Sequence, residues 1–172
     1  MKKLYFIRHG LSVLNVKGLY AGRTETPLTK EGKQQSKIAG LAARKLNIDL
    51  IVSSPMNRAL ETARIIANEI NYPTHRIITD NRLVERDFGI LEAMPWSPDH
   101  SYQYKLQYGA ENDKQLLKRT QEFLKWLKTQ KAENILIVGH GASGRALRSL
   151  IKKDFPMSSP RPLTNAVIYE WI

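Results

Sequence analysis

Short apolar runs without polar alternation are the feature of this sequence that most restricts its fold. A strand with one face in water alternates apolar and polar residues, whereas a strand covered on both faces is apolar throughout. We therefore expect the strands of a sheet that is covered on both faces. The runs are Leu4–Ile7, Leu50–Val52, Ile77–Ile78, Ile135–Val138 and, as the last candidate, Val167–Trp171.

Helical patterns lie between these runs, at residues 29–46, 55–70 and 142–151. The clearest pattern follows Asn112-Asp113, a pair typical of a helix start, and its apolar residues form one stripe. Strands that alternate with helices predict an α/β fold, a three-layer α/β/α sandwich with a mainly parallel sheet. The final strand is expected to be an antiparallel edge strand.

The length of 172 residues predicts a single domain over residues 1–172. Residues 93–109 interrupt the alternation, because they contain two prolines and several aromatic residues without clear periodicity. We expect a surface loop or a small lid there. The tryptophans, including Trp96, are assigned to packing, and His100 is assigned to the surface.

Composition and charge exclude several classes of protein. Cysteine is absent, which excludes disulfides, thiolate metal sites and a cysteine nucleophile. The formal charge of +11 favours an anionic substrate only weakly, because many lysines lie on polar helix faces. We find no motif that reads nucleic acid, no signal peptide and no membrane-spanning run. We expect no nucleic-acid partner, no membrane partner and a cytoplasmic location.

Polar segments follow three of the predicted strands. In open α/β sheets, ligands bind at the carboxyl ends of the strands, so these segments are expected to converge at one edge of the sheet. They are Arg8-His9-Gly10, Ser53-Ser54-Pro55 and Gly139-His140-Gly141.

His9 is the first candidate for chemistry. A neutral imidazole is a competent nucleophile near pH 7, and Gly10 permits a sharp turn that would hold the ring at the rim of a cleft. A lone histidine beside a glycine is more often a turn residue, but His140-Gly141 has the same relation to its own strand. Arg8 offers the planar, charged fork that a phosphate binds well, or else forms a surface ion pair.

Arg58 follows a predicted helix start at Pro55, so its charge opposes the helix dipole at a cost of about 0.3–1 kcal/mol. A bound anion would reverse this conflict, and we favour a ligand role, although Glu61 is an alternative source of compensation. Glu85 follows the third strand and is a candidate proton donor to a leaving oxygen. Its alternative role is a salt bridge to Arg86 or Arg82.

Four further residues are candidates for binding the substrate. Ser12 and Asn15 either donate hydrogen bonds to phosphate oxygens or cap a helix. The other two candidates are Arg86 and Gly141, which directly follow Glu85 and His140.

Taken in order, four motifs resemble those of the histidine phosphatase superfamily, the phosphoglycerate mutase-like group of phosphatases and mutases. The motifs are Arg8-His9-Gly10, Ser54-Pro55-x-x-Arg58-Ala59, Glu85-x-x-Phe88-Gly89 and Gly139-His140-Gly141. Lesser matches extend the resemblance over nearly the whole chain. They are Ser12, Asn15, Pro27-Leu28-Thr29, Gly32, Gly109-x-Glu111, Arg145 and Asn165-Ala166.

The resemblance implies a division of labour. His9 would form a phosphohistidine, while Arg8, Arg58 and His140 hold the phosphate oxygens. Glu85 would donate a proton to the alcohol and then activate water. Neither a metal nor another cofactor is implied. Members often carry an acidic residue where this chain has Leu11, a Glu-Gly pair where it has Glu92-Ala93, and a Gly-Glu-Ser run where it has Glu111-Asn112. These departures bear on substrate choice more than on activity.

Hydrolysis of small phosphate monoesters is favoured over mutase transfer, because residues 92–109 provide little material to enclose the site. A protein phosphohistidine phosphatase and a non-catalytic phosphate-binding module remain alternatives. A zinc site of His9, His140 and Glu85 is a third, opposed by the neighbouring arginines. Nucleic-acid binding through the +11 charge ranks last.

Overall fold

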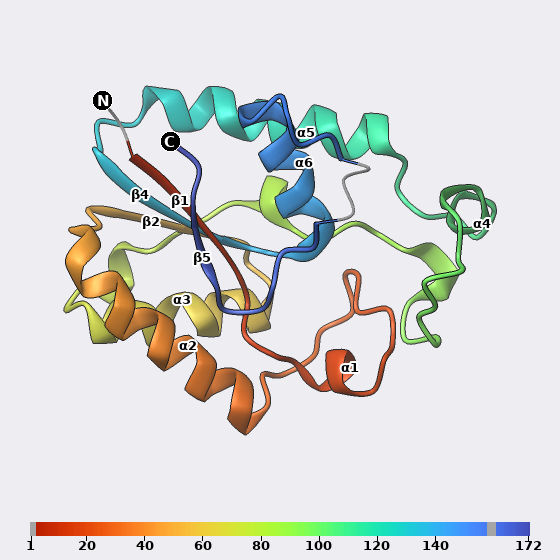
Figure 1. The fold of residues 1–172 in the computed structure, drawn as a ribbon, viewed down its shortest axis with the longest axis horizontal. Helices are drawn as coiled ribbons and strands as arrows, with labels where there is room; N and C mark the ends of the chain where they lie inside the picture. The colour runs from red at the N-terminus through yellow and green to blue at the C-terminus, as the bar shows by residue number, and fades with distance from the viewer. Residues whose placement is uncertain (1–2, 158–160) are drawn as a thin grey trace.

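The computed structural model describes residues 3–157 and 161–172, and this part of the chain is built on a five-stranded sheet (Figure 1). The order of the strands is β3-β2-β4-β1-β5. All neighbouring strands are parallel except β1 and β5, which confirms the predicted mainly parallel sheet with an antiparallel edge strand. The strands are β1 (Lys3–Arg8), β2 (Leu50–Ser53), β3 (Ile78–Thr79), β4 (Asn134–Gly139) and β5 (Ile168–Glu170).

Helices cover both faces of the sheet. Figure 1 shows α2 (Lys30–Ala43) and α3 (Asn57–Glu69) on one face, and α5 (Asp113–Thr129) and α6 (Gly141–Ile151) on the other. The predicted three-layer α/β/α sandwich is confirmed. Two shorter helices lie in the connections. They are α1 (Val13–Val16) and α4 (Tyr102–Gln107).

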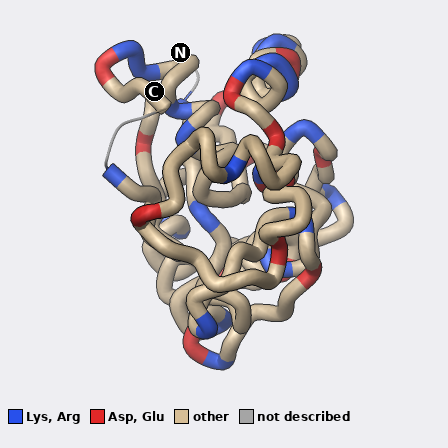
Figure 2. The backbone as a smooth tube through the Cα atoms, turned by 90° about the vertical axis from the view of Figure 1, so that its right-hand side faces the viewer, with Lys and Arg blue, Asp and Glu red and all other residues tan. Residues whose placement is uncertain are grey.

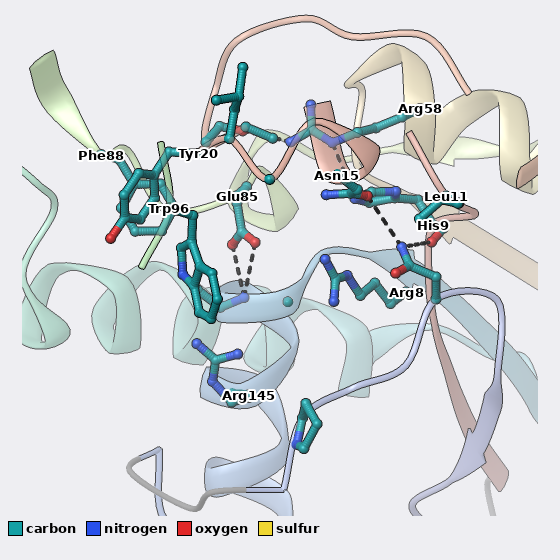
Figure 3. Close-up of a pocket in the computed structure, with 18 residues that line it drawn as sticks. Arg8, His9, Leu11, Asn15, Tyr20, Arg58, Glu85, Phe88, Trp96 and Arg145 are labelled. Carbon is teal, nitrogen blue, oxygen red and sulfur yellow. Dashed lines mark hydrogen bonds between the residues drawn. The ribbon is translucent and has the colours of Figure 1, made fainter. Parts of the chain in front are cut away.

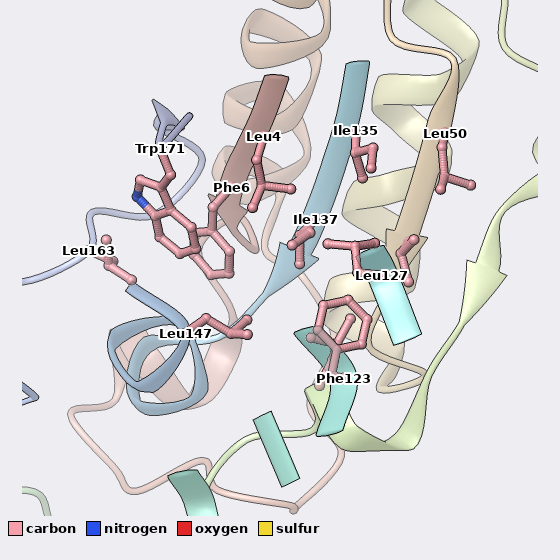
Figure 4. Close-up of a cluster of buried hydrophobic side chains, with 12 residues drawn as sticks. Leu4, Phe6, Leu50, Phe123, Leu127, Ile135, Ile137, Leu147, Leu163 and Trp171 are labelled. Carbon is pink, nitrogen blue, oxygen red and sulfur yellow. The ribbon is translucent and has the colours of Figure 1, made fainter. Parts of the chain in front are cut away.

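Side chains of β1 alternate between two apolar cores, one in each interlayer space. Leu4 and Phe6 pack with the core under α5 and α6, which Figure 4 shows, whereas Tyr5 and Ile7 pack with the core under α2 and α3. Full burial of one such side chain contributes about 1.5–3 kcal/mol. Two covered faces explain why this strand is apolar at every position.

The edge strand β3 differs from the expectation. The sequence predicts a buried strand at Ile77–Ile78, but β3 consists of Ile78 and Thr79, and both side chains are exposed. The N–H of Ile77 donates to the carbonyl of Thr74 and closes a short turn, which delays the start of the strand by one residue. The apolar run therefore indicated the strand, but it did not reveal its edge position.

Residues 93–109, which we call the cover segment, fold back on residues 18–20. The N–H of Tyr20 donates to the carbonyl of Met94 at 2.9 Å, and the N–H of Trp96 donates to the carbonyl of Gly18 at 2.8 Å. The predicted loop or small lid contains the short helix α4, which Ser101 caps at its N-terminus. Ala93, the first residue of the segment, has a φ of 61°, in the left-handed region.

The left-handed conformation of Ala93 leads to the first prediction. Replacing it with glycine (Ala93→Gly) is expected to raise the free energy of unfolding by up to about 1 kcal/mol. Relief of about 1–2 kcal/mol of backbone strain exceeds the roughly 0.4–1 kcal/mol of added unfolded-state entropy. Urea unfolding measures the difference. The control is Ala42→Gly at an exposed position of α2, which should lose about 1 kcal/mol, and an equal loss in both variants contradicts the prediction.

Candidate active site

The register of the parallel strands brings the predicted polar segments together. The last residue of β1, Arg8, is paired with Gly139, the last residue of β4. The last residue of β2, Ser53, is paired with Val138 of β4. The three strands thus end side by side, as expected from the sequence. The residues that directly follow them are His9, Ser54 and His140.

His9 is almost fully buried, and its Nδ1 lies 2.7 Å from the carbonyl oxygen of Gly10. A carbonyl oxygen only accepts, so Nδ1 carries the proton, and the unprotonated Nε2 accepts a hydrogen bond from Nε of Arg58 at 3.2 Å. Burial lowers the pKa of His9 well below its ordinary value, and His140, Arg58 and Arg8 lower it further. The ring is therefore neutral near pH 7, with Nε2 as its nucleophilic atom.

Gly10 fixes the loop that carries His9, but not by the sharp turn expected from the sequence. It is not among the glycines with positive φ. A Cβ at this position would lie 2.3 Å from the carbonyl oxygen of Gly32 in α2. The glycine is required because the loop backbone packs directly on that helix, and the N–H of Gly10 donates to Oγ1 of Thr62.

Arg58 is the second residue of α3, so the expected cation in the first helical turn is present. Its fully buried guanidinium donates to the carbonyls of Gly22 at 2.6 Å and Thr24 at 3.0 Å. Burial lowers its pKa, although nearby carboxylates oppose this effect. Glu61 does not compensate the charge, because it forms an ion pair with Lys33 at 2.8 Å. Arg58 lines the cavity described below.

Arg8 and His140 both retain polar atoms without partners. Nη1 of Arg8 donates to the carbonyl of Leu163, but its buried Nε has no partner in the described part of the chain. Nε2 of His140 lies 2.8 Å from Oγ of Ser54, and Nδ1 has no partner among the described residues. The rings of His140 and His9 are 5.2 Å apart, and burial lowers the pKa of His140 well below its ordinary value.

Glu85 is held at the N-terminus of α6. Its carboxylate accepts hydrogen bonds from the backbone N–H groups of Ala142, Ser143 and Arg86, at distances of 2.8–3.1 Å. Burial raises the pKa of Glu85, but these donors and the charge of Arg145 outweigh burial and lower it below its ordinary value. The carboxyl group is therefore ionised in the protein without substrate.

The salt-bridge alternative for Glu85 is wrong. Arg82 pairs with Asp80, and Arg86 pairs with Asp113. The same contact argues against Arg86 as a substrate-binding residue. Its side chain is buried against Asp113 and is not among the described residues that line the cavity, so it contributes only its backbone N–H, to Glu85.

Arg119, on α5, anchors the backbone of the segment that carries Glu85. Its guanidinium donates to the carbonyls of Arg82 at 2.7 Å, Val84 at 2.8 Å and Glu85 at 3.1 Å. The same group makes two hydrogen bonds to the carboxylate of Glu111, at 2.7 and 2.8 Å. The carboxyl group of Glu85 is thus fixed from one side by α6 and its backbone from the other by α5.

Ser12 and Asn15 have different positions. Ser12 is fully buried and caps α1 in a reciprocal pair of hydrogen bonds with Asn15, which supports the capping role. Asn15 also lines the cavity, beside Asn165, whose side-chain amide donates to the carbonyl of His9 at 2.8 Å.

Gly141 lies among charged side chains at the cavity. A Cβ built on it would make ordinary contacts rather than clashes. The nearest atoms would be Oε2 of Glu85 at 3.6 Å, Nη1 of Arg145 at 3.7 Å and Cζ of Arg8 at 3.7 Å.

A cavity of about 480 Å³ is lined by six of the predicted site residues: Arg8, His9, Asn15, Arg58, Glu85 and Gly141 (Figure 3). Several residues that line it were not predicted as site residues, among them Tyr20, Phe88, Trp96 and Arg145. Arg145 was named from the sequence only as a lesser match of the family resemblance, and it lies one helical turn after Gly141. The packing role assigned to Trp96 is wrong, because its side chain is 54% exposed at the cavity. No periodicity in the sequence indicated this position.

The zinc hypothesis gains no support from the structure. In residues 3–157 and 161–172, no group of three or more metal-binding side chains is placed to hold an ion, so a zinc site has no ligand set there.

Among the described residues, no helix has the length and apolarity needed to cross a membrane. Figure 2 shows basic and acidic positions interspersed over the face that it presents.

Comparisons with known proteins identify the family of this chain. The chain matches the histidine phosphatase superfamily (branch 1) over residues 4–170. A Hydrogenobacter thermophilus protein with a provisional phosphoserine phosphatase name is 31% identical, over 88% of this chain and 79% of that protein. A 2,3-bisphosphoglycerate-dependent phosphoglycerate mutase of Rhizobium etli is 30% identical, over 89% of this chain and 81% of the mutase. The solved structure of Bacillus stearothermophilus YhfR, 27% identical, has a TM-score of 0.84 and matches 98% of this chain and 89% of its own. This chain belongs to the histidine phosphatase superfamily.

Proposed function

We propose that the protein hydrolyses phosphate monoesters of small metabolites through a phosphohistidine on His9. The observation that carries the proposal is the buried, neutral ring of His9, whose Nε2 is unprotonated and whose neighbours Arg8 and Arg58 line the same cavity. Cationic donors fixed around a nucleophile stabilise the charge that develops during phosphoryl transfer. The phosphatase names among the relatives support the same class of reaction.

In the first step, Nε2 of His9 forms a bond to phosphorus while the bond from phosphorus to the alcohol oxygen breaks. Arg8, Arg58 and His140 hold the other phosphate oxygens, and Glu85 passes a proton to the departing alcohol. In the second step, the carboxylate of Glu85 accepts a proton from water as the water oxygen attacks phosphorus. The bond to Nε2 then breaks, and inorganic phosphate leaves.

The low pKa of Glu85 raises the question of where the first proton comes from. The carboxylate is ionised before substrate binds, whereas the second ionisation of a phosphate monoester has a pKa of about 6. The substrate monoanion can therefore carry the proton into the site and pass it to the alcohol oxygen through Glu85. This route reconciles an acid role with a carboxylate that three N–H groups stabilise.

Hydrolysis is favoured over mutase transfer because transfer requires an enclosed site that keeps water out. The cover segment is short and is attached along residues 18–20, and Trp96 at its rim remains more than half exposed. The mutase among the relatives keeps transfer as the second candidate function.

Removal of the nucleophile should abolish turnover. His9→Ala is expected to reduce hydrolysis of 4-nitrophenyl phosphate to background, because no bond from nitrogen to phosphorus can form. With a labelled ester, the wild-type protein should acquire acid-labile phosphate and the variant none, and a chelator should leave wild-type turnover unchanged. The exposed His75 supplies the control variant, His75→Ala, which should behave as wild type. Unchanged turnover in His9→Ala would refute the assignment.

Loss of the proton donor should depend on the leaving group. Glu85→Gln is expected to lower kcat/KM for an alkyl phosphate by roughly 10²–10⁴-fold, the usual range for general acid catalysis. 4-Nitrophenyl phosphate should lose much less, because 4-nitrophenolate departs without a proton. Steady-state kinetics on both esters measure the two losses, with Glu122→Gln on the surface as the control. Equal losses for both esters count against the acid role.

The pKa directions predict an acidic optimum. Protonation inactivates His9, and because its pKa is lowered, the acid limb of kcat/KM should lie well below the ordinary histidine value of about 6.5. Above a pH of about 6 the substrate monoanion disappears, so kcat/KM for an alkyl phosphate should fall about tenfold per pH unit. A pH–rate profile for propyl phosphate checks both limbs. An acid limb near 6.5 would mean that His9 is not held neutral.

A further inference from the structure

The cavity has a charged end and an aromatic end. In Figure 3 the aromatic side chains lie on one side of Glu85, and the proposed phosphate-binding groups lie on the other. The aromatic group consists of Tyr20, Phe88 and Trp96, with Arg145 beside Trp96, and the phosphate-binding group of Arg8, His9, Asn15 and Arg58. If phosphate occupies the charged end and Glu85 faces the alcohol oxygen, the carbon skeleton of the alcohol extends toward the aromatic end.

We call these three aromatic residues the aromatic wall; ring contacts hold Tyr20 before any ligand binds, and a backbone hydrogen bond holds the strip that carries Trp96. The rings of Tyr20 and Phe88 are 4.8 Å apart. His100 stacks on Tyr20 at 5.8 Å and on Tyr104 of α4 at 4.3 Å, so the cover segment supports the wall from behind. Backbone hydrogen bonds join the strip around Tyr20 to the strip around Trp96. A preformed wall needs little ordering when a ligand packs on it.

Several polar groups of the wall are already occupied. The hydroxyl of Tyr20 is hydrogen-bonded to Nδ1 of His100 at 2.9 Å. The backbone N–H groups of Tyr20 and Trp96 donate to the carbonyls of Met94 and Gly18. A sugar alcohol would bring several hydroxyl groups to aromatic faces that offer them no hydrogen bond, and leaving hydroxyl groups unpaired costs binding energy.

Trp96 leaves a large apolar surface of the aromatic wall exposed to water. Its side chain is 54% exposed, whereas Trp171, which stacks on Phe6 in the core, is 5% exposed. Ligand sites typically combine apolar and aromatic walls with a few fixed polar groups, which is the composition of this cavity. A flat apolar group placed on the indole would remove its exposed face from water.

We propose that the natural substrate carries a planar, largely apolar ring on its alcohol half, and that this ring packs on the aromatic wall. The proposal rests on the proposed function for the orientation of the substrate. It narrows the substrate from small phosphate monoesters in general to ring-bearing ones, and it disfavours sugar phosphates. Trp96 is the specificity-determining residue.

The test separates recognition from catalysis by using inert phosphonates. Three compounds share the phosphonate and a propyl chain: propylphosphonate, 3-cyclohexylpropylphosphonate and 3-phenylpropylphosphonate. Calorimetry gives their Kd values. Because aromatic contacts add energy beyond buried area, the phenyl compound should bind about three- to tenfold more tightly than the cyclohexyl compound. Propylphosphonate should bind most weakly.

Variants at the wall then locate the preference. Trp96→Ala should remove the advantage of phenyl over cyclohexyl, and Trp96→Phe should restore part of it. The control is Met94→Ala on the same strip, which is exposed but does not line the cavity and should keep the full preference. Equal binding of phenyl and cyclohexyl compounds to wild type, or a preference that survives in Trp96→Ala, overturns the proposal.

Turnover of the matching phosphate esters reports separately on the proposed function. If 2-phenylethyl and ethyl phosphate are both inert and no phosphohistidine forms, hydrolysis is refuted, while the phosphonate ranking still decides whether the wall recognises a ring. If both esters are hydrolysed with equal kcat/KM and the phosphonates bind equally, the function stands and the ring proposal fails.

Discussion

The rest of the site depends on the contact between the carboxylate of Glu85 and the N-terminus of α6. The helix begins directly after His140, at the end of β4, and its first N–H groups lack partners within the helix. Glu85 satisfies them, and the positive end of the helix dipole in turn favours its ionised form. The carboxylate of Glu85 therefore fixes the segment that carries it relative to His140 and to the end of β4.

Electrostatics explain why such a site keeps its histidines neutral. Burial is the main cause that lowers the pKa of both His9 and His140, and the positive charges of Arg8 and Arg58 beside them lower it further. The backbone carbonyls that bind Arg58 spread its charge without cancelling it. The arrangement is suited to an anionic phosphate group, which would add negative charge beside the two arginines.

Much of the fold could be predicted from the sequence, because the apolar runs and helical stripes are local signals of burial. The convergence of His9, Ser54 and His140 could be predicted as well, since parallel strands end at the same edge. What could not be predicted depends on contacts distant in sequence. The partner of Arg86 lies 27 residues away, and the interaction of Arg119 with the Glu85 carbonyl spans 34 residues. Periodicity carries no information about such pairs.

The packing of Gly10 against Gly32 has a consequence for how this protein can evolve. The loop that carries His9 is fixed to α2 through backbone atoms, so few substitutions there are compatible with the same geometry. Two residues of the aromatic wall, Tyr20 and Trp96, belong to irregular strips of chain that pair with each other, whereas Phe88 lies in the segment that carries Glu85. Lineages can therefore replace Tyr20 and Trp96 and acquire new substrates while the reacting groups stay unchanged. Among related proteins, residue types should vary more on the aromatic side of the cavity than on the side that carries His9.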